Sequence, residues 1–303
     1  MNIENLLRDT LADMAGEEPP PAPGRFLQGR PRWFQGRGLA LVAAGAVTAL
    51  AVGSTAVLHG LSSSRVPLDV AVQRNAITVT VPEGTRLARV FEALSSRTGR
   101  PVADFERAAK DGAAALGLPS YARGRLEGFA FPGTYEFAPT ATPGEILGAM
   151  VARYRRAAED TALAEGARRA GRTPLEILTV ASIVQAEAFR PGDMPKIARV
   201  LYNRLDRKMR LQVDSTLLYG LGKYGVSATR EDIISPSPYN TYKHLGLPPG
   251  PIGSPGTAAI RAALHPASGR WLYFVVTDPA KGTMKFTSSH EEYTRLAGIR
   301  VSR

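Results

Sequence analysis

The sequence contains no cysteine, so disulfide bonds, Cys-X-X-Cys redox chemistry and thiolate metal sites are excluded. Three catalytic signatures are also missing: the His-Glu-X-X-His motif of zinc peptidases, the Gly-X-Ser-X-Gly elbow of serine hydrolases, and the phosphate-binding P-loop. The few histidines are widely separated, and His265 directly precedes Pro266, which favours a structural role for it. We therefore expect no metal and no cofactor.

Length and charge leave several classes of protein open. With 303 residues, the chain can form two modest domains plus a tail, and a hydrophobic content of 44% is enough for a sizeable core. The net charge is +11 and the pI is about 10.1. Nucleic acid, anionic lipid headgroups and an acidic polymer are each a suitable partner for such a basic chain.

The segment 38–58 carries no charged residue and is rich in Ala, Val and Leu. Roughly 20 apolar residues at about 1.5 Å each cross the hydrocarbon core of a bilayer. A buried helix of a soluble domain and a signal peptide are the alternatives. A signal peptide normally starts near the N-terminus, however, and here a long polar stretch comes first. We therefore expect a single transmembrane helix over this segment.

The residues beside this segment predict its orientation. Four arginines and no acidic residue lie between positions 25 and 37, whereas Arg65 and Asp69 on the far side offset each other. The positive-inside rule therefore places residues 1–37, a Pro-rich tail, in the cytoplasm. The expected location is the cell membrane, with everything after the span outside the cytoplasm. Wall polymer or lipid is then the favoured partner, and nucleic acid is not expected.

A linker over 59–75 leads into residues 76–140, which have the pattern of a small αβ subdomain. Alternating β-branched residues predict a strand over 77–81. Apolar spacing then predicts two short helices, over 85–96 and 101–110.

The segment 128–137 is aromatic and strand-like. Its aromatic side chains either belong to the core or stack on sugar rings. Two helix starts follow, Thr142-Pro143-Gly144-Glu145 and Thr173-Pro174-Leu175-Glu176. In each, the threonine is the N-cap, the proline occupies the first turn, and the glutamate reaches back to the cap.

Glu187 is the carboxylate that the helical pattern singles out. Val180, Ile183 and Val184 precede it by seven, four and three residues, so it continues an apolar face of the helix. Desolvation favours the protonated form of a carboxyl group, which is the form that a general acid for a glycosidic oxygen requires. The alternative is a glutamate that is exposed at the helix end or paired with an arginine.

The residues that follow predict the walls of a cleft. A second helix is expected after Asp193, with Arg204 beside its apolar stripe, facing either the cleft or solvent. Asp214 or Ser215 is expected to cap a short helix that runs to Leu221. Two stiff loops, rich in Pro and Gly, suit a groove that holds an extended sugar chain; they cover 237–242 and 247–253.

A series of short motifs occurs in order along the second half of the chain: Ala181–Glu187, Val200–Leu205, Met209–Asp214, Tyr239–Tyr242, Gly246–Ile252, Ser254–Gly256, Ala263–Pro266 and Leu272–Val275. With these motifs, the sequence from about Glu127 to the C-terminus resembles the MltG-type endolytic murein transglycosylases, the YceG-like family. The family's catalytic glutamate falls on Glu187. The segment 80–135 resembles the family's LysM-like region.

The resemblance implies a lyase acting on nascent peptidoglycan strands. Glu187 would protonate the oxygen that joins N-acetylmuramic acid to N-acetylglucosamine. It would then accept the proton of the C6 hydroxyl that closes on C1, which leaves a 1,6-anhydro end and makes a second catalytic carboxylate unnecessary. Arg204 is expected to meet the lactyl or peptide carboxylate. Placement of the substrate is assigned to Gln212, Asp214, Asn240, Thr241 and Tyr242.

The expected fold class is α+β. It comprises an N-terminal transmembrane helix over 38–58, a LysM-like αβ subdomain over 76–140 and a mixed α+β catalytic domain over 141–303. The resemblance further implies action beside peptidoglycan synthases, where such cleavage would terminate strand elongation. Two other functions stay open. A muramidase-type hydrolase would use Asp214 as base or nucleophile and leave a reducing end, and a non-catalytic scaffold would only bind the wall.

Overall fold

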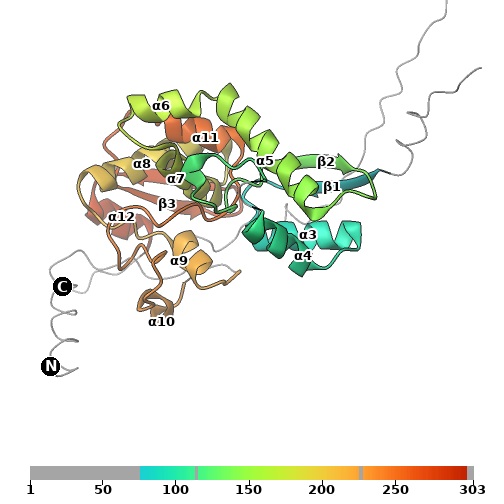
Figure 1. Ribbon diagram of the computed structural model, residues 1–303. Helices are drawn as coiled ribbons and strands as arrows, with labels where there is room; N and C mark the ends of the chain where they lie inside the picture. The colour runs from blue at the N-terminus through green and yellow to red at the C-terminus, as the bar shows by residue number, and fades with distance from the viewer. Residues whose placement is uncertain (1–75, 113–114, 225–227, 299–303) are drawn as a thin grey trace, which may run out of the picture.

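The computed structural model describes residues 76–112, 115–224 and 228–298. The tail, the transmembrane helix and the linker that we expect within residues 1–75 lie outside the described residues. Among the helices of the three described ranges, none is both long and apolar enough to cross a membrane. These ranges form a mixed α+β fold that includes two small antiparallel sheets (Figure 1).

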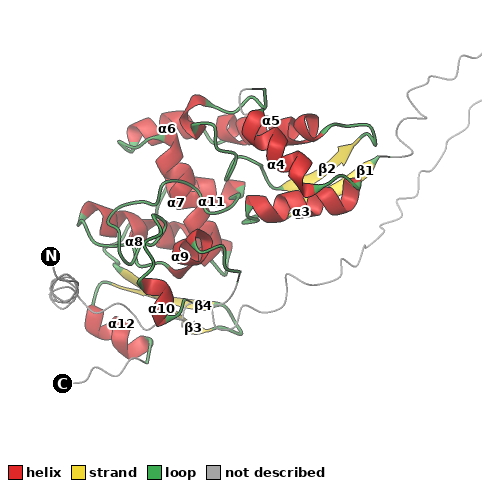
Figure 2. Cartoon of the chain, turned by 60° about the horizontal axis from the view of Figure 1, so that its bottom comes forward, coloured by secondary structure: helices red, strands yellow, loops and turns green. Residues whose placement is uncertain are grey.

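A βααβ unit forms one end of the fold (Figures 1 and 2). It consists of β1 (Ile77–Val81), α3 (Leu87–Thr98), α4 (Val102–Asp111) and β2 (Gly133–Phe137). The two strands pair antiparallel, from Ile77 opposite Phe137 to Val81 opposite Gly133. The predicted first strand and both predicted helices are confirmed.

The aromatic residues of the segment 128–137 lie in the core. Only the last part of the segment, β2, is a strand. The four aromatic side chains are at most 8% exposed: Phe129, Phe131, Tyr135 and Phe137. The Phe129 ring packs edge-on against the Tyr154 ring, with centroids 4.9 Å apart. Of the two interpretations of these aromatics, the structure supports the core and not a sugar-stacking surface.

The rest of the chain is mainly helical and surrounds α7. Its elements are η3 (Ser120–Ala122), α5 (Pro143–Asp160), α6 (Leu163–Arg169), α7 (Pro174–Glu187), η4 (Pro191–Asp193), α8 (Met194–Asp206), α9 (Asp214–Gly220), α10 (Arg230–Ile233), α11 (Thr257–Leu264), β3 (Tyr273–Asp278), β4 (Thr283–Thr287) and α12 (His290–Leu296). β3 and β4 form an antiparallel hairpin. The sequence predicted α5, α7, α8 and α9, and it did not predict α6, α10 or the elements after α10. The predicted cap of α9 by Asp214 or Ser215 is wrong, because Val213 is the N-cap residue and no side chain caps the helix.

Helix α7 is the centre of the core. It packs against α6, α8, α9 and α11, and every residue from Ile177 to Val184 is buried. The apolar face inferred from the sequence is therefore one side of a helix that is buried all round. This is the pattern expected for a central helix, since an amphipathic stripe belongs to helices that keep one face in water.

Both predicted capping boxes are present. Thr142 accepts the Glu145 amide at 3.3 Å, and Thr173 accepts the Glu176 amide at 3.2 Å. Each glutamate in turn accepts the amide of its threonine, at 2.7 Å in both cases. The boxes fix where α5 and α7 begin, and the second therefore sets the register of the helix that carries Glu187.

Replacing the α7 cap by Thr173→Ala is expected to lower the free energy of unfolding by about 1 kcal/mol, because it leaves the Glu176 amide without its acceptor. Urea denaturation measures this difference. Thr257→Ala is the matched control: Thr257 opens α11, whose start has no side-chain cap, so this change should cost clearly less. Equal losses in the two variants would contradict the assigned role of the capping box.

The βααβ unit is joined to the rest of the fold by main-chain hydrogen bonds at the turn after β1. The Gly84 amide donates to the Ser254 carbonyl at 2.7 Å, and the Ser254 amide donates to the Thr85 carbonyl at 3.0 Å. Gly84 has a φ of +77°, a left-handed conformation that glycine adopts without strain. Ser254 lies just before α11 in the sequence, and α11 packs on α7. The βααβ unit therefore docks close to the end of the helix that carries Glu187.

Candidate active site

Glu187 is the last residue of α7 and is 4% exposed. The helix ends there because Ala188 turns to extended backbone and Pro191 follows three residues later. The predicted burial of this carboxylate is confirmed. A carboxyl group is seldom buried this deeply unless the fold gives it polar partners or uses its titration.

Asp214 and Tyr242 form a buried pair beside Glu187. Asp214 is the first residue of α9 and is 1% exposed, and its Oδ1 accepts the Tyr242 hydroxyl at 2.5 Å. Burial raises the pKa of Tyr242 well above 10, and the charge and hydrogen bond of Asp214 raise it further. Tyr293 and Glu187 are close enough to act in the same direction. The tyrosine therefore stays protonated and donates to the aspartate.

Asn240 and Thr241 hold the loop that carries Tyr242. The Asn240 amide group donates to the Ile233 and Ser235 carbonyls, each at 2.8 Å, and its Oδ1 accepts the Tyr242 amide at 3.0 Å. The Thr241 hydroxyl accepts the Val213 amide at 3.0 Å. Both side chains are at most 1% exposed. These contacts position Tyr242 against Asp214, while direct contact of the two side chains with a substrate stays a prediction.

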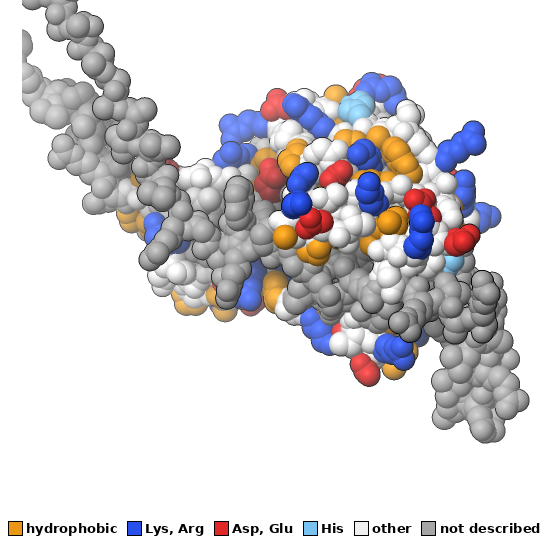
Figure 3. Space-filling model, turned by 180° about the vertical axis from the view of Figure 1, so that it is seen from behind, with side chains coloured by type: hydrophobic (Ala, Val, Ile, Leu, Met, Phe, Trp, Pro, Cys, Tyr) orange, Lys and Arg blue, Asp and Glu red, His pale blue; other side chains and the backbone are white. Residues whose placement is uncertain are grey.

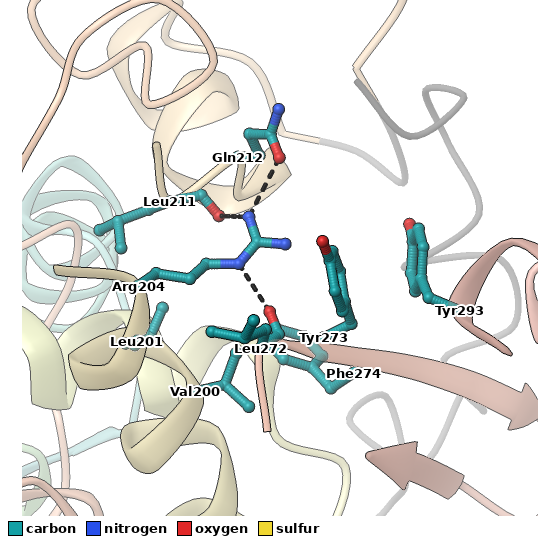
Figure 4. A pocket seen from close by; sticks show the side chains of 9 residues that line it. All are labelled: Val200, Leu201, Arg204, Leu211, Gln212, Leu272, Tyr273, Phe274 and Tyr293. Carbon is teal, nitrogen blue, oxygen red and sulfur yellow. Dashed lines mark hydrogen bonds between the residues drawn. The ribbon is translucent and has the colours of Figure 1, made fainter. Parts of the chain in front are cut away.

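Arg204 lies on α8 and is 6% exposed (Figure 4). Its Nε donates to the Leu272 carbonyl at 2.7 Å, and its Nη1 donates to the Leu211 carbonyl at 3.2 Å and to Gln212 Oε1 at 3.0 Å. The guanidinium also lies 5.0 Å from the Tyr273 ring centroid. Arg204 thus ties α8 to the start of β3 and to the segment before α9. Recognition of a substrate carboxylate by Arg204 stays a prediction.

Gln212 links this cluster to the loop of Thr241. Its amide donates to the Thr241 carbonyl at 3.0 Å, and its backbone is left-handed, with a φ of 51°. Such a conformation costs a non-glycine residue about 1 kcal/mol or more, and it persists only where the surroundings impose it. Here the imposing contacts are the Arg204 and Thr241 hydrogen bonds. The segment that leads into Asp214 is therefore held rigidly from both sides.

A pocket opens between α8, the start of β3 and α12 (Figure 4). Arg204, Gln212 and Tyr273 contribute polar groups to its wall, and Tyr293 completes it from α12. The remaining lining is apolar: Val200, Leu201, Leu211, Leu272 and Phe274. Because Tyr293 also lies close to Tyr242, the pocket adjoins the Asp214–Tyr242 pair. Its accessible volume is about 20 Å³, which is room for about one water molecule and not for a sugar ring.

The sequence did not indicate Tyr273 and Tyr293 as site residues. Tyr273 stood within a family motif but was given no role, and Tyr293 lies on α12, for which no helix was predicted. Their rings stack 5.0 Å apart. Only the chain fold brings them to the site, since each is 50 or more residues from Asp214.

On the face seen in Figure 3, lysines and arginines are interspersed with acidic and apolar side chains. Within the described ranges, no three His, Asp or Glu side chains come together in a way that could hold a metal ion. A buried glutamate beside a hydrogen-bonded Asp–Tyr pair defines a candidate acid/base site.

The model of the YceG-like family matches residues 40–298, and the chain therefore belongs to this family. A 2.6 Å crystal structure of a yceG-like protein from Listeria monocytogenes has the same fold, with a TM-score of 0.68 and 31% sequence identity. The alignment covers 73% of this chain and 76% of the Listeria chain.

Two curated relatives carry the name endolytic murein transglycosylase. The protein of Bacillus subtilis (strain 168) is 38% identical over 172 residues, which are 56% of this chain and 46% of the relative. The protein of Streptococcus pneumoniae serotype 2 is 35% identical over 191 residues, which are 60% of this chain and 34% of the relative. The chain thus spans less than half the length of the curated relatives that it matches.

Proposed function

We propose that this chain is an endolytic murein transglycosylase that cleaves the bond between N-acetylmuramic acid and N-acetylglucosamine. The observation that carries the proposal is the buried carboxyl group of Glu187 at the end of α7, beside the Asp214–Tyr242 pair. The names of the relatives from Bacillus subtilis and Streptococcus pneumoniae support the same activity.

In the proposed reaction, Glu187 supplies and then recovers one proton. The protonated carboxyl group donates to the bridging oxygen, and the bond from C1 of the muramyl ring to that oxygen breaks. The C6 hydroxyl of the same ring attacks C1 and loses its proton to the Glu187 carboxylate, which restores the acid. No water is consumed, so the products are a 1,6-anhydro end and a free N-acetylglucosamine end. One carboxyl group suffices because the nucleophile belongs to the substrate.

Asp214 is proposed to support this chemistry rather than to attack the sugar. Its Oδ1 is already hydrogen-bonded to Tyr242, and both groups are buried. A negative charge held in this position would stabilise an oxocarbenium-like transition state electrostatically. Gln212, Asn240, Thr241 and Tyr242 would shape this side of the cleft, and the positive charge of Arg204 would favour a substrate carboxylate nearby.

We further propose that the enzyme is anchored by a single span over residues 38–58, with its N-terminus in the cytoplasm and its active site outside. The uncharged segment and the arginines before it support this arrangement. An enzyme held there would meet strands as they leave the membrane-bound synthases, and cleavage would end their elongation.

The test uses the full chain, purified peptidoglycan and mass spectrometry of the soluble products. Transglycosylation should give fragments lighter by one water than those of hydrolysis. Fragments with reducing ends would instead identify a muramidase-type hydrolase, with Asp214 as the next residue to examine. Binding of peptidoglycan without cleavage, by a chain that is folded by circular dichroism, would favour a non-catalytic scaffold and contradict the proposal.

A further inference from the structure

Glu127 connects two parts of the fold that are far apart in the sequence. It lies in the segment between α4 and β2, and its Oε1 accepts the Leu87 amide at 3.1 Å. Its Oε2 accepts the Tyr219 hydroxyl at 3.0 Å. Leu87 is the first residue of α3, and Tyr219 lies near the end of α9. One carboxylate therefore joins the βααβ unit to the helix that begins with Asp214.

The Glu127 carboxylate provides a capping acceptor and a negative charge at the start of α3, which has neither of its own. The N-cap residue of α3, Arg86, makes no side-chain cap hydrogen bond, and the first turn of the helix contains no acidic residue. The first amides of a helix have no partner within it, and they favour a negative charge nearby. Glu127, 40 residues further along the chain, meets both requirements.

Arg86 makes a second contact at the same, C-terminal end of α9. Its Nη1 donates to the Lys223 carbonyl at 2.7 Å, just beyond the C-terminus of the helix. Its guanidinium also lies over the Tyr219 and Tyr224 rings, 5.4 Å and 4.7 Å from their centroids. A cation is favoured at the carbonyl end of a helix. Arg86 and Glu127 thus both bind the C-terminal end of α9 to the start of α3.

Helix α9 is short and closely packed by the 237–242 loop. It contains 7 residues, with Asp214 at its start and Gly220 at its end. A Cβ atom on Gly220 would lie 2.3 Å from the Ser237 hydroxyl oxygen and 2.7 Å from Tyr239 Cβ, which shows how closely the 237–242 loop approaches. A displacement at Tyr219 would therefore be passed on to Asp214.

We propose that Glu127 is a positioning residue for the cleavage reaction: by binding the first amide of α3 and the hydroxyl of Tyr219, its carboxylate holds α9 in the position that sets Asp214 against Tyr242. The inference rests on the proposed function, because it concerns the geometry of the same site. Glu127 acts through α9, with no contact to the substrate required.

Burial raises the pKa of Glu127 from 4.5 to about 7, although Tyr219, the Leu87 amide and Arg86 each act to lower it. The charged or titratable groups facing it are Arg86 before α3, Tyr219 on α9 and Tyr239 on the neighbouring loop. Tyr239 in turn lies near Arg125 of the Glu127 segment. The carboxyl group therefore changes its charge near neutral pH, and only the anion accepts hydrogen bonds through both oxygens without offering a donor.

Ionisation of Glu127 changes the stability of the fold and the positioning of α9 in opposite directions. Because the folded state raises this pKa, it holds the proton more tightly than the unfolded chain does. The stabilisation from the protonated group is full below about pH 4.5 and is lost as the pH rises to about 7. Ionisation thus costs stability while it strengthens the contacts to Leu87 and Tyr219.

The test compares the full chain with Glu127→Gln and with Glu145→Gln, at about pH 5.5 and about pH 8.5. Gln resembles the protonated acid, since it is neutral and has one donor group. At the higher pH, Glu127→Gln should lower kcat about tenfold with little change in KM, as expected for one lost charge-assisted contact. At the lower pH, the two proteins should differ by less than about twofold. Glu145→Gln, which alters a capping glutamate of α5, should give the same ratio to wild type at both values.

If the ratio of kcat between wild type and Glu127→Gln were the same at both pH values, the proposal would be overturned. A purely structural role makes the opposite prediction, since removing a buried charge should make the variant relatively more stable at the higher pH. Hydrogen exchange of the α9 amides gives a readout without catalysis. It should be faster in Glu127→Gln than in wild type at the higher pH only, and equal exchange there would also overturn the proposal. If the wild type itself did not cleave peptidoglycan, the proposed function would be refuted instead.

Discussion

Glu187→Gln is expected to abolish cleavage of peptidoglycan, with a loss in kcat of at least about a thousandfold. The amide cannot protonate the bridging oxygen, and it cannot take the proton of the attacking C6 hydroxyl, so both halves of the proposed reaction fail. The shape of the side chain is kept, and a neutral group is tolerated at a site that is 4% exposed. The measurement is the rate of release of 1,6-anhydro fragments, with circular dichroism to check the fold.

The same helix offers the matched control. Glu176→Gln changes a glutamate at the start of α7, where it caps Thr173 in solvent. This variant should lose at most about 1 kcal/mol of stability and keep its cleavage rate within about twofold. If Glu187→Gln retained a tenth or more of the wild-type rate, Glu187 would not be the acid, and the mechanism proposed for this chain would be wrong.

The sequence predicts those features that depend on neighbours along the chain. Both capping boxes involve residues three apart, and the burial of Glu187 follows from the apolar residues in the two turns before it. Helix α9 was expected because Asp214 precedes an apolar run. Each of these is local, and local preferences are reliable where the fold does not oppose them.

The features that the sequence did not predict depend on contacts between distant segments. Tyr242 and Asp214 are 28 residues apart, and the Leu272 carbonyl that accepts a hydrogen bond from Arg204, just before β3, is 68 residues away. The spacing of apolar residues along the chain does not indicate which side chain contacts which carbonyl across such distances. The sequence therefore named Arg204 and Asn240 as polar residues of the cleft, but it did not reveal that both make their described hydrogen bonds to the protein itself.

The same reason explains why the sequence indicates no role for Glu127. Beside aromatic residues in one short segment, it resembles an ordinary charged residue at the edge of a strand. Its importance comes from Leu87 and Tyr219, which precede and follow it by 40 and 92 residues. Only the fold shows that one carboxylate serves two helices.

Breaking the Asp214–Tyr242 pair is expected to have the second-largest effect. Asp214→Asn removes the negative charge beside Glu187 and should lower kcat about a hundredfold, which is within the range for one electrostatic contact in a buried site. Tyr242→Phe leaves the buried carboxylate without this donor and should lower kcat about tenfold or more. Both rates are measured from anhydro products, and both unfolding free energies from urea denaturation.

The double variant distinguishes a working pair from two independent residues. If Tyr242 acts by holding and orienting the Asp214 carboxylate, its hydroxyl has little left to do once that carboxylate is an amide. The double variant should then be about as slow as Asp214→Asn alone. Tyr202→Phe is the control, because its buried hydroxyl donates to the Ala263 carbonyl at 2.8 Å on another side of the core. It should lower stability by about 1 kcal/mol and leave kcat nearly unchanged. If the fold losses in kcat of the two single variants multiplied in the double variant, Asp214 and Tyr242 would act separately. The hydrogen bond between them would then have no part in catalysis.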